Sequence, residues 1–375
     1  MHGCMLDQTD RQASGQHLLY AKEQYTVALG EARLLVEHPA PTHIHLVLMV
    51  CLLFVAWEGV QGDYQASQRH MNSGRALFAR FSGQIRARPS LKNIIHDMTQ
   101  VLARMDIAAM SFSDDSAPYH APPHELDSEL QLVLQPFMSV QQASSSLMEI
   151  TRRLLRLGNE SITETDAAGL GRRQGFFKEC TQHLCKWNGY WESWCAENST
   201  DSTDSLAVIN VQLWRACSEV FVKTGFFSGP ETRYDNALVE FRRMAELSKK
   251  LASAICLESE TVSFSLDLGY LIPTFFIATR CRDPNIRRQA LEVLQSYSRH
   301  EGAWQSGPAA AIADKWIQIE EKGLAQPDTA MQIPLCQRVI NMEVQVRKSA
   351  ALARLRFQLA GVGGIGSVVE EVVTW

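Results

Sequence analysis

Apolar side chains recur every three or four residues along most of this chain, as far as about residue 321. This is the spacing of one face of an amphipathic helix, so it predicts a mainly α protein. Prolines, glycines and polar clusters separate the helices, and stacked helical hairpins would give a multi-helix, solenoid-like domain. The expected helices are approximately residues 18–37, 43–60, 63–81, 90–110, 125–157, 172–197, 205–224, 231–256, 266–279, 284–298 and 309–322.

The helix expected near residue 284 has a clear physical start. Asp283 can accept a backbone N–H as the N-cap residue, and Pro284 loses no hydrogen bond at the first helical position. We therefore expect this helix to begin at Pro284.

The apolar spacing changes to every second residue near the end of the chain. Apolar and polar residues alternate from Ile340 to Arg347 and from Ala353 to Leu359, and a third β-rich run covers residues 368–375. Period two predicts strands with one buried face. We therefore expect a flexible N-terminus (1–19), a helical domain (20–330), and a small antiparallel β-meander (331–375) packed on that domain.

The composition is that of an ordinary globular protein. The 375 residues are 46% hydrophobic and 21% charged, which is enough to build a sizeable core. The formal net charge of −5 argues against a nucleic-acid-binding surface over the whole domain, because phosphate contacts need clustered Lys and Arg. We interpret the basic run at Arg152, Arg153 and Arg156 as a solvated helix face.

The cysteines and the apolar runs bear on location. Nine scattered cysteines, several of them within apolar helical patterns, indicate free thiols in a reducing compartment. The first residues lack the apolar core of a signal peptide, and the longest apolar run, residues 44–57, is shorter than the ~20 residues needed to span a bilayer. A nuclear or cytosolic protein without membrane contact is therefore expected.

Two motifs suggest cofactors but have the wrong context. Gly361 to Gly366 matches G-x-G-x-x-G, yet too few residues follow it for the helix that a dinucleotide site requires, so we interpret it as a hairpin loop. Cys180, His183, Cys185 and Cys195 could suggest zinc. Cys180 and Cys185 are five apart on an expected helix and point in different directions, so core packing is the better interpretation.

No catalytic motif is recognisable, and we assign no catalytic, cofactor-binding or metal residue. His43 and His45 would lie on different helix faces, while His120 and His124 flank a proline-containing loop. Asp114 also lies in a loop, outside any aspartate-rich helix. The chain is therefore not expected to be an enzyme. A helical biosynthetic enzyme stays open as an alternative, because the members of a catalytic triad need not be adjacent.

A series of segments carries a resemblance by its order along the chain. They are Cys51–Phe54, Trp57–Glu58, Gly62–Tyr64, Ala66, His70, Gly74, Tyr234–Phe241, Phe264–Pro273, Cys281–Leu291, Glu301–Trp304 and Ile319–Glu321. This order resembles the C-terminal regulatory region of fungal zinc-cluster transcription factors, in which six cysteines bind two zinc ions. The similarity extends from about Tyr20 to Trp375.

The resemblance implies a nuclear transcription regulator, often one that controls a metabolic or secondary-metabolite gene cluster. Partners would be the transcription machinery, another regulator or a second copy of the chain, and a ligand-sensing pocket would lie among the helices. The family's paired C-x-x-C motifs are missing, since Cys4 is the one cysteine before the first family-like helix. We therefore assign no zinc and no direct DNA contact to this chain. A non-enzymatic protein–protein scaffold is the main alternative.

The resemblance also suggests structural roles for the most distinctive block. Arg287 and Arg288 are expected to pair with Glu301 or Glu292, and Trp304 is expected to anchor the turn that follows Glu301.

Overall fold

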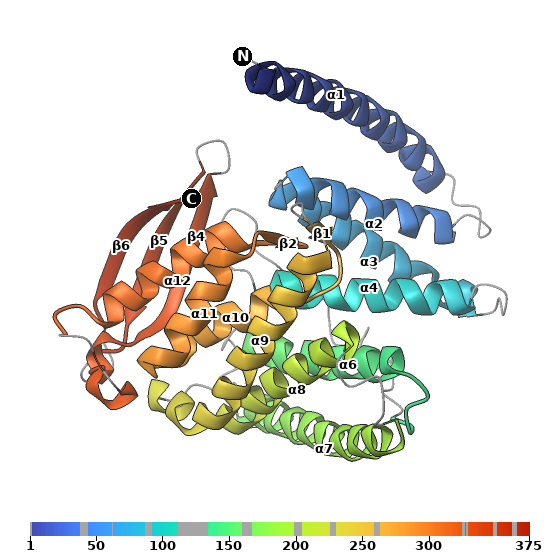
Figure 1. Ribbon diagram of the computed structural model, residues 1–375. Helices are drawn as coiled ribbons and strands as arrows, with labels where there is room; N and C mark the ends of the chain where they lie inside the picture. The colour runs from blue at the N-terminus through green and yellow to red at the C-terminus, as the bar shows by residue number, and fades with distance from the viewer. Residues whose placement is uncertain are drawn as a thin grey trace. The chain divides into compact units, whose positions relative to one another are not determined.

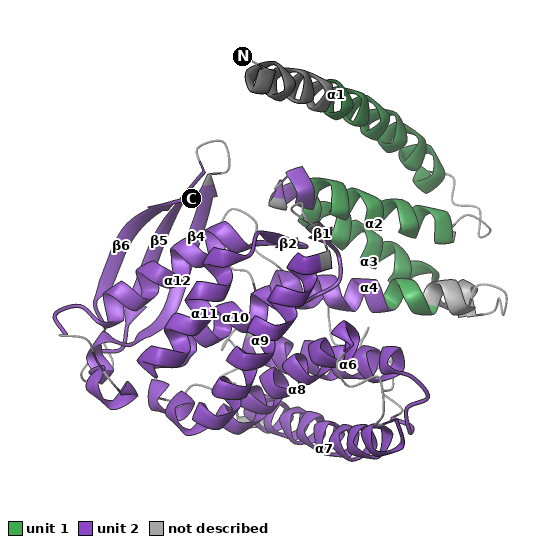
Figure 2. Ribbon diagram, viewed as in Figure 1, with its two compact units in different colours: residues 1–58, 66–99 green, residues 59–65, 100–375 purple. Residues whose placement is uncertain are grey.

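The computed structural model describes residues 2–37, 44–61, 63–86, 92–111, 134–159, 167–198, 205–225, 230–258, 263–324, 327, 329–347, 351–361 and 366–375. The chain is mainly helical and carries a three-stranded antiparallel sheet near its C-terminus (Figure 1), which confirms the expected fold class. It divides into two compact units (Figure 2). The first contains residues 1–58 and 66–99, and the second contains residues 59–65 and 100–375.

The first unit is built from helices α1 (His2–Glu37), α2 (Ile44–Gln61) and α3 (Tyr64–Arg86) and the start of α4 (Lys92–Ser111). Helix α1 begins well before residue 18, so the segment expected to be a flexible N-terminus is helical. Tyr25 of α1 stacks on Trp57 of α2, with 5.8 Å between ring centroids, and its hydroxyl donates a hydrogen bond to Glu58. A small core of Leu48, Phe81 and Met98 joins α2, α3 and α4.

The second unit contains most of the helices. They are α6 (Val140–Asn159), α7 (Ala167–Glu197), α8 (Leu206–Thr224), the 3₁₀ segment η2 (Glu231–Ala237), α9 (Leu238–Glu258), α10 (Leu271–Arg280), α11 (Pro284–Ser296) and α12 (Ser306–Glu320). Consecutive helices pack in the pairs α6 and α7, α8 and α9, and α10 and α11. The predicted start of α11 is confirmed, because the Asp283 carboxylate accepts the N–H groups of Asn285 and Ile286.

Two expected helices are shorter than the apolar pattern suggested. Residues 134–139 are not helical, so α6 begins at Val140 rather than near residue 125. Helix α10 begins at Leu271, and β1 (Ser263–Ser265) precedes it. This strand pairs in parallel with β2 (Arg299–Glu301), which pairs antiparallel with β3 (Trp304–Gln305). Strands this short carry too few residues to show a period, so the sequence pattern did not predict this sheet.

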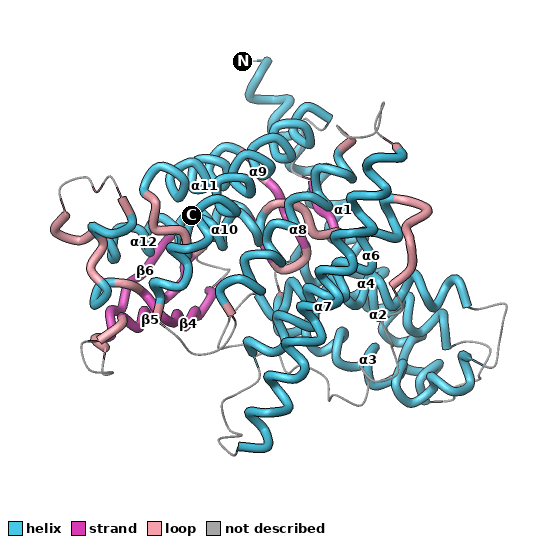
Figure 3. The backbone as a smooth tube through the Cα atoms, turned by 90° about the horizontal axis from the view of Figure 1, so that it is seen from below, coloured by secondary structure: helices cyan, strands magenta, loops and turns pink. Residues whose placement is uncertain are grey.

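The C-terminal β-meander is confirmed. Two 3₁₀ segments, η3 (Ala330–Gln332) and η4 (Leu335–Gln337), lead into strands β4 (Val339–Arg347), β5 (Leu352–Leu359) and β6 (Val368–Thr374), which pair antiparallel in that order. Its apolar face packs on α12, beside which the strands lie in Figures 1 and 3. The contact residues are Val344, Ala353, Leu355, Phe357, Leu359 and Val373 of the sheet and Ile312, Trp316 and Ile319 of the helix.

One position in β4 departs from the alternation. The register between β4 and β5 shifts between Val339 and Asn341, as in a β-bulge. Because a bulge moves later side chains to the other face of the sheet, Val339 is buried whereas Ile340 is 39% exposed. The alternation had placed Ile340 on the buried face, and that prediction was wrong.

The basic run on α6 is also a correction. Arg152, Arg153 and Arg156 are buried, not part of a solvated face. Glu149 lies 2.8 Å from Arg152 Nη2 and 2.9 Å from Arg153 Nε. Burial opposes the ionisation of Glu149, but the hydrogen bonds and charges of Arg152 and Arg153 outweigh it and lower its pKa. A buried carboxylate one helical turn away therefore makes this basic run a core feature.

Candidate functional site

Glu301 caps the N-terminus of helix α10, although it lies thirty residues after Leu271, the first residue of that helix. Its carboxylate accepts the N–H groups of Gly269 (2.9 Å), Tyr270 (3.2 Å) and Leu271 (3.2 Å), and Arg299 Nε lies 2.6 Å away. These N–H groups have no partner within the helix, so a carboxylate at this end satisfies them and complements the helix dipole. Glu301 is therefore a helix cap.

Arg287 and Arg288 pair with carboxylates of α12 and of the turn after it. Arg287 Nη2 lies 2.8 Å from Glu320 Oε2, and Arg288 pairs with Glu321. The prediction that these arginines pair with Glu301 or Glu292 was therefore wrong. Residues of α11 face α12, while Glu301 is committed to α10.

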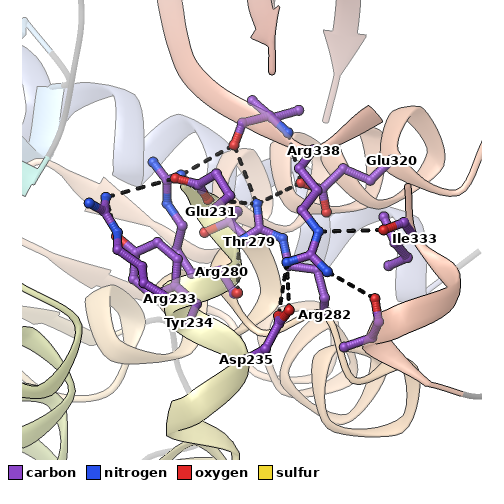
Figure 4. A network of polar contacts seen from close by, with 12 residues as sticks. Glu231, Arg233, Tyr234, Asp235, Thr279, Arg280, Arg282, Glu320, Ile333 and Arg338 are labelled. Carbon is purple, nitrogen blue, oxygen red and sulfur yellow. Dashed lines mark hydrogen bonds and ion pairs between the residues drawn. The ribbon is translucent and has the colours of Figure 1, made fainter. Parts of the chain in front are cut away.

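A buried arginine network connects η2, the α10–α11 connection and α12 (Figure 4). Arg282 is at its centre, with Nη2 located 2.9 Å from Glu231 Oε2 and 2.8 Å from Glu320 Oε1. Arg282, Glu231 and Glu320 are all buried. Burial alone would raise the pKa of Glu320, but the charges of Arg282 and Arg287 lower that pKa to about 2. Glu320 is thus an ionised carboxylate in the interior.

The same network holds the first residue of the C-terminal sheet. The carbonyl oxygen of Val339 accepts hydrogen bonds from Arg280 Nη1 and Arg282 Nη2, both at 3.3 Å. The amide of Val339 donates to Glu320 Oε1 at 2.9 Å. Both polar groups of one peptide residue are therefore bound by charged side chains, which fixes the sheet to the helices.

A cavity of about 280 Å³ lies next to this network, between helices α10 and α12 and the inner face of the sheet. Its walls are mostly aromatic and aliphatic. The lining includes Leu155, Phe221, Tyr234, Ile272, Phe275, Phe276, Thr279, Arg280, Trp304, Ile312, Trp316, Met342, Val344 and Trp375. A concave apolar site with few polar groups is the usual form of a small-molecule site.

Trp304 forms part of the cavity wall. Its Nε1 donates to the carbonyl oxygen of Ala108 (3.2 Å) and lies 3.1 Å from Ser111 Oγ, and its ring centroid lies 5.0 Å from that of Phe275. Trp304 is buried and fastens the turn after Glu301 to the end of α4. The side chain expected to anchor a turn therefore also shapes the cavity.

Arg280 brings the charged network to the cavity wall. Its Nη1 lies 3.1 Å from Glu231 Oε2, and its guanidinium carbon lies 5.6 Å from the centre of the Tyr234 ring and 5.1 Å from that of Trp316. Cation–π contacts of this kind hold a guanidinium in place. The sequence pattern gave no sign of this site, because Arg280 finds its partners 49 and 59 residues away.

The cysteines and histidines do not form a second site in the described ranges. Cys180 is buried and Cys185 is exposed, so the four residues considered for zinc are not gathered around one point. Among residues that the structure describes, no three His, Cys, Asp or Glu side chains could hold a metal ion. His43, Asp114, His120, His124 and residues 362–365 lie outside the described residues.

The cavity walls carry few ionisable side chains among the described residues. The described residues that line the cavity include no cysteine, histidine, aspartate or glutamate. Burial raises the pKa of the nearby Cys281 thiol to about 12, so it is protonated at neutral pH.

Among the described helices, none has the length and apolar content of a membrane span. No family model matches the chain, and no curated protein or solved structure matches it significantly.

Proposed function

We propose that this chain is a transcription-regulator-like protein that acts without enzymatic chemistry and binds a small molecule in its helical body. Two observations support the proposal: the ordered segments that resemble fungal zinc-cluster regulators, and the apolar cavity. The proposed setting is the nucleus, and the proposed role is control of a metabolic or secondary-metabolite gene cluster through partners. No DNA contact is assigned to the chain itself.

The cavity is the observation that carries the proposal. It lies where α10, α12 and the sheet meet, so a bound molecule would contact three elements at once. A ligand can shift a conformational equilibrium only if it binds one arrangement better than another. A site between a helical body and a sheet meets this condition, because its shape depends on how the two pack.

Tethering tests the regulatory role directly. The full chain is fused to a foreign DNA-binding domain and expressed in a fungal host with a reporter that carries the matching operator. We expect reporter output to differ from that of the DNA-binding domain alone, and a fluorescent fusion to accumulate in the nucleus. An unchanged reporter, with the fusion protein present in the nucleus at a comparable level, would instead favour a scaffold.

A further inference from the structure

We propose that the cavity binds a small carboxylic acid, whose apolar body lies among the aromatic walls and whose carboxylate binds Arg280. This inference rests on the proposed function, because it names the ligand class of the same cavity. Three features support it: the unused donors of Arg280, the contact between Arg280 and Trp316, and the apolar walls and size of the cavity.

Arg280 has hydrogen-bonding capacity to spare. A guanidinium carries five N–H donors in a planar fork that matches a carboxylate. In Arg280, Nη1 contacts Glu231 Oε2 and the carbonyl oxygen of Val339, and no acceptor among the described residues contacts Nε or Nη2. Its side chain lines the cavity and is 21% exposed. The unused edge of the fork is therefore available to a ligand.

Trp316 holds Arg280 at the cavity wall. The guanidinium carbon of Arg280 lies 5.1 Å from the centre of the Trp316 ring, and Trp316 itself is buried. A cation–π contact of this kind restrains the guanidinium, so its unused edge keeps its position at the cavity.

The remaining walls define the rest of the ligand. Phe275, Phe276, Trp304, Met342 and Val344 present carbon to the cavity. A volume of about 280 Å³ is slightly below the roughly 300–1,000 Å³ typical of ligand sites. The site therefore suits a single aromatic system or a short branched chain bearing the carboxylate.

Matched acids and amides test the charge requirement with the full chain. The probes are benzoate and benzamide, 2-naphthoate and 2-naphthamide, and 4-methylpentanoate and its amide, screened by ligand-observed NMR and quantified by calorimetry. At least one acid should bind, and should bind more tightly than its amide. Arg280→Gln should weaken acid binding by about 10- to 100-fold and leave amide binding nearly unchanged.

Two further variants separate the cavity wall from the network. Trp316→Phe keeps an aromatic ring but removes part of the apolar wall, so it should weaken acid and amide alike by about 2- to 10-fold. Arg288→Gln removes the same charge from the same network at a residue that is 46% exposed and does not line the cavity. It should leave both affinities unchanged. Should Arg280→Gln fail to fold, Arg280→Lys replaces it, because lysine keeps the charge beside Glu231 but loses the planar fork.

The possible failures are distinguishable. Equal binding of acids and amides, or full acid binding by folded Arg280→Gln, would overturn the carboxylate assignment and leave the cavity as a site for neutral ligands. Binding of no probe to the folded wild-type chain would overturn the cavity as a ligand site. The regulatory role would then depend on the tethered reporter alone, which does not require a ligand to be known.

Discussion

The carboxylate of Glu301 lies 2.9 Å from the backbone nitrogen of Gly269, and a side chain at position 269 would occupy the space that the carboxylate fills. A Cβ built on Gly269 meets Glu301 Oε1 at 2.3 Å. Glu301 is held by three backbone N–H groups and Arg299, so it cannot move aside without losing bonds. This pair explains why a glycine precedes helix α10.

The first prediction follows from this pair. Gly269→Ala should lower the free energy of unfolding by about 1–3 kcal/mol, because it disrupts the bonds that Glu301 makes to the start of α10. Urea unfolding measures the effect. The matched control is Gly189→Ala in α7, where an added Cβ meets nothing within 4 Å. It should stabilise the protein by about 0.5–1 kcal/mol, and equal effects of the two substitutions would contradict the capping role.

Glu320 provides a prediction about pH. Its pKa is lowered to about 2 in the folded protein, against an ordinary value of about 4.3 in the unfolded chain. A lowered folded-state pKa means that the stabilisation is complete above the unfolded-state value and is lost as the pH falls toward the folded-state value. The free energy of unfolding should therefore decrease between about pH 5 and pH 2, as urea titrations at several pH values would show.

Substitution of the same residue tests the network. Glu320→Gln leaves Arg282 and Arg287 with less counter-charge in the interior and should cost about 3–5 kcal/mol at pH 7. The free energy of unfolding of the Glu320→Gln variant should also decrease less between about pH 5 and pH 2 than that of the wild-type chain. Glu343→Gln is the control, since Glu343 pairs with Arg356 on the surface and should contribute no more than about 1 kcal/mol. A small effect of Glu320→Gln would mean that the buried pairs add little to stability.

The bulge in β4 predicts different costs at two adjacent positions. Val339 is fully buried, whereas Ile340 is partly exposed. Val339→Ala should cost about 2 kcal/mol, while Ile340→Ala, although it removes more carbon, should cost less than about 1 kcal/mol. Thermal or urea unfolding of both variants checks the order. The reverse order would mean that the strand keeps a regular register through this point.

Thiol labelling should separate the cysteines into two classes. Cys185, Cys256 and Cys336 are exposed and should react quickly with a thiol reagent in the native protein. Cys180 and Cys281 are buried, and burial raises the pKa of each to about 12, so they should react only after unfolding. Peptide mass spectrometry after timed labelling identifies the sites. Rapid native labelling of Cys281 would show that the helix pair around it opens readily.

The sequence predicted the helices and strands of this fold better than the contacts between its buried residues. Asp283 and Pro284 define the start of α11 through local chemistry, and alternation from Ala353 to Leu359 defines β5, because both signals lie within a few neighbouring residues. The bulge at Ile340 was missed because its cause is pairing with another strand. Sequence patterns thus predict the features that depend on interactions between neighbouring residues.

The candidate site could not have been found in the same way. Arg282 finds Glu231 and Glu320 in other helical segments, 51 and 38 residues away along the chain. Arg152 looked like a surface residue because charge is usually solvated, yet Glu149 and Asp106 surround it in the core. Pairing between distant residues depends on tertiary packing, and periodicity contains no information about it.

Arg280 pairs with Glu231, donates a hydrogen bond to the carbonyl oxygen of Val339 and lines the cavity. Ligand binding and the packing of the sheet on the helices are therefore thermodynamically linked. A molecule that engages Arg280 only in the folded chain stabilises the docked sheet by an amount that grows with the logarithm of its concentration. The linkage is reciprocal. A partner protein that binds the sheet only when it is packed on the helices would raise the affinity for the ligand by the same factor by which the ligand raises the affinity for the partner.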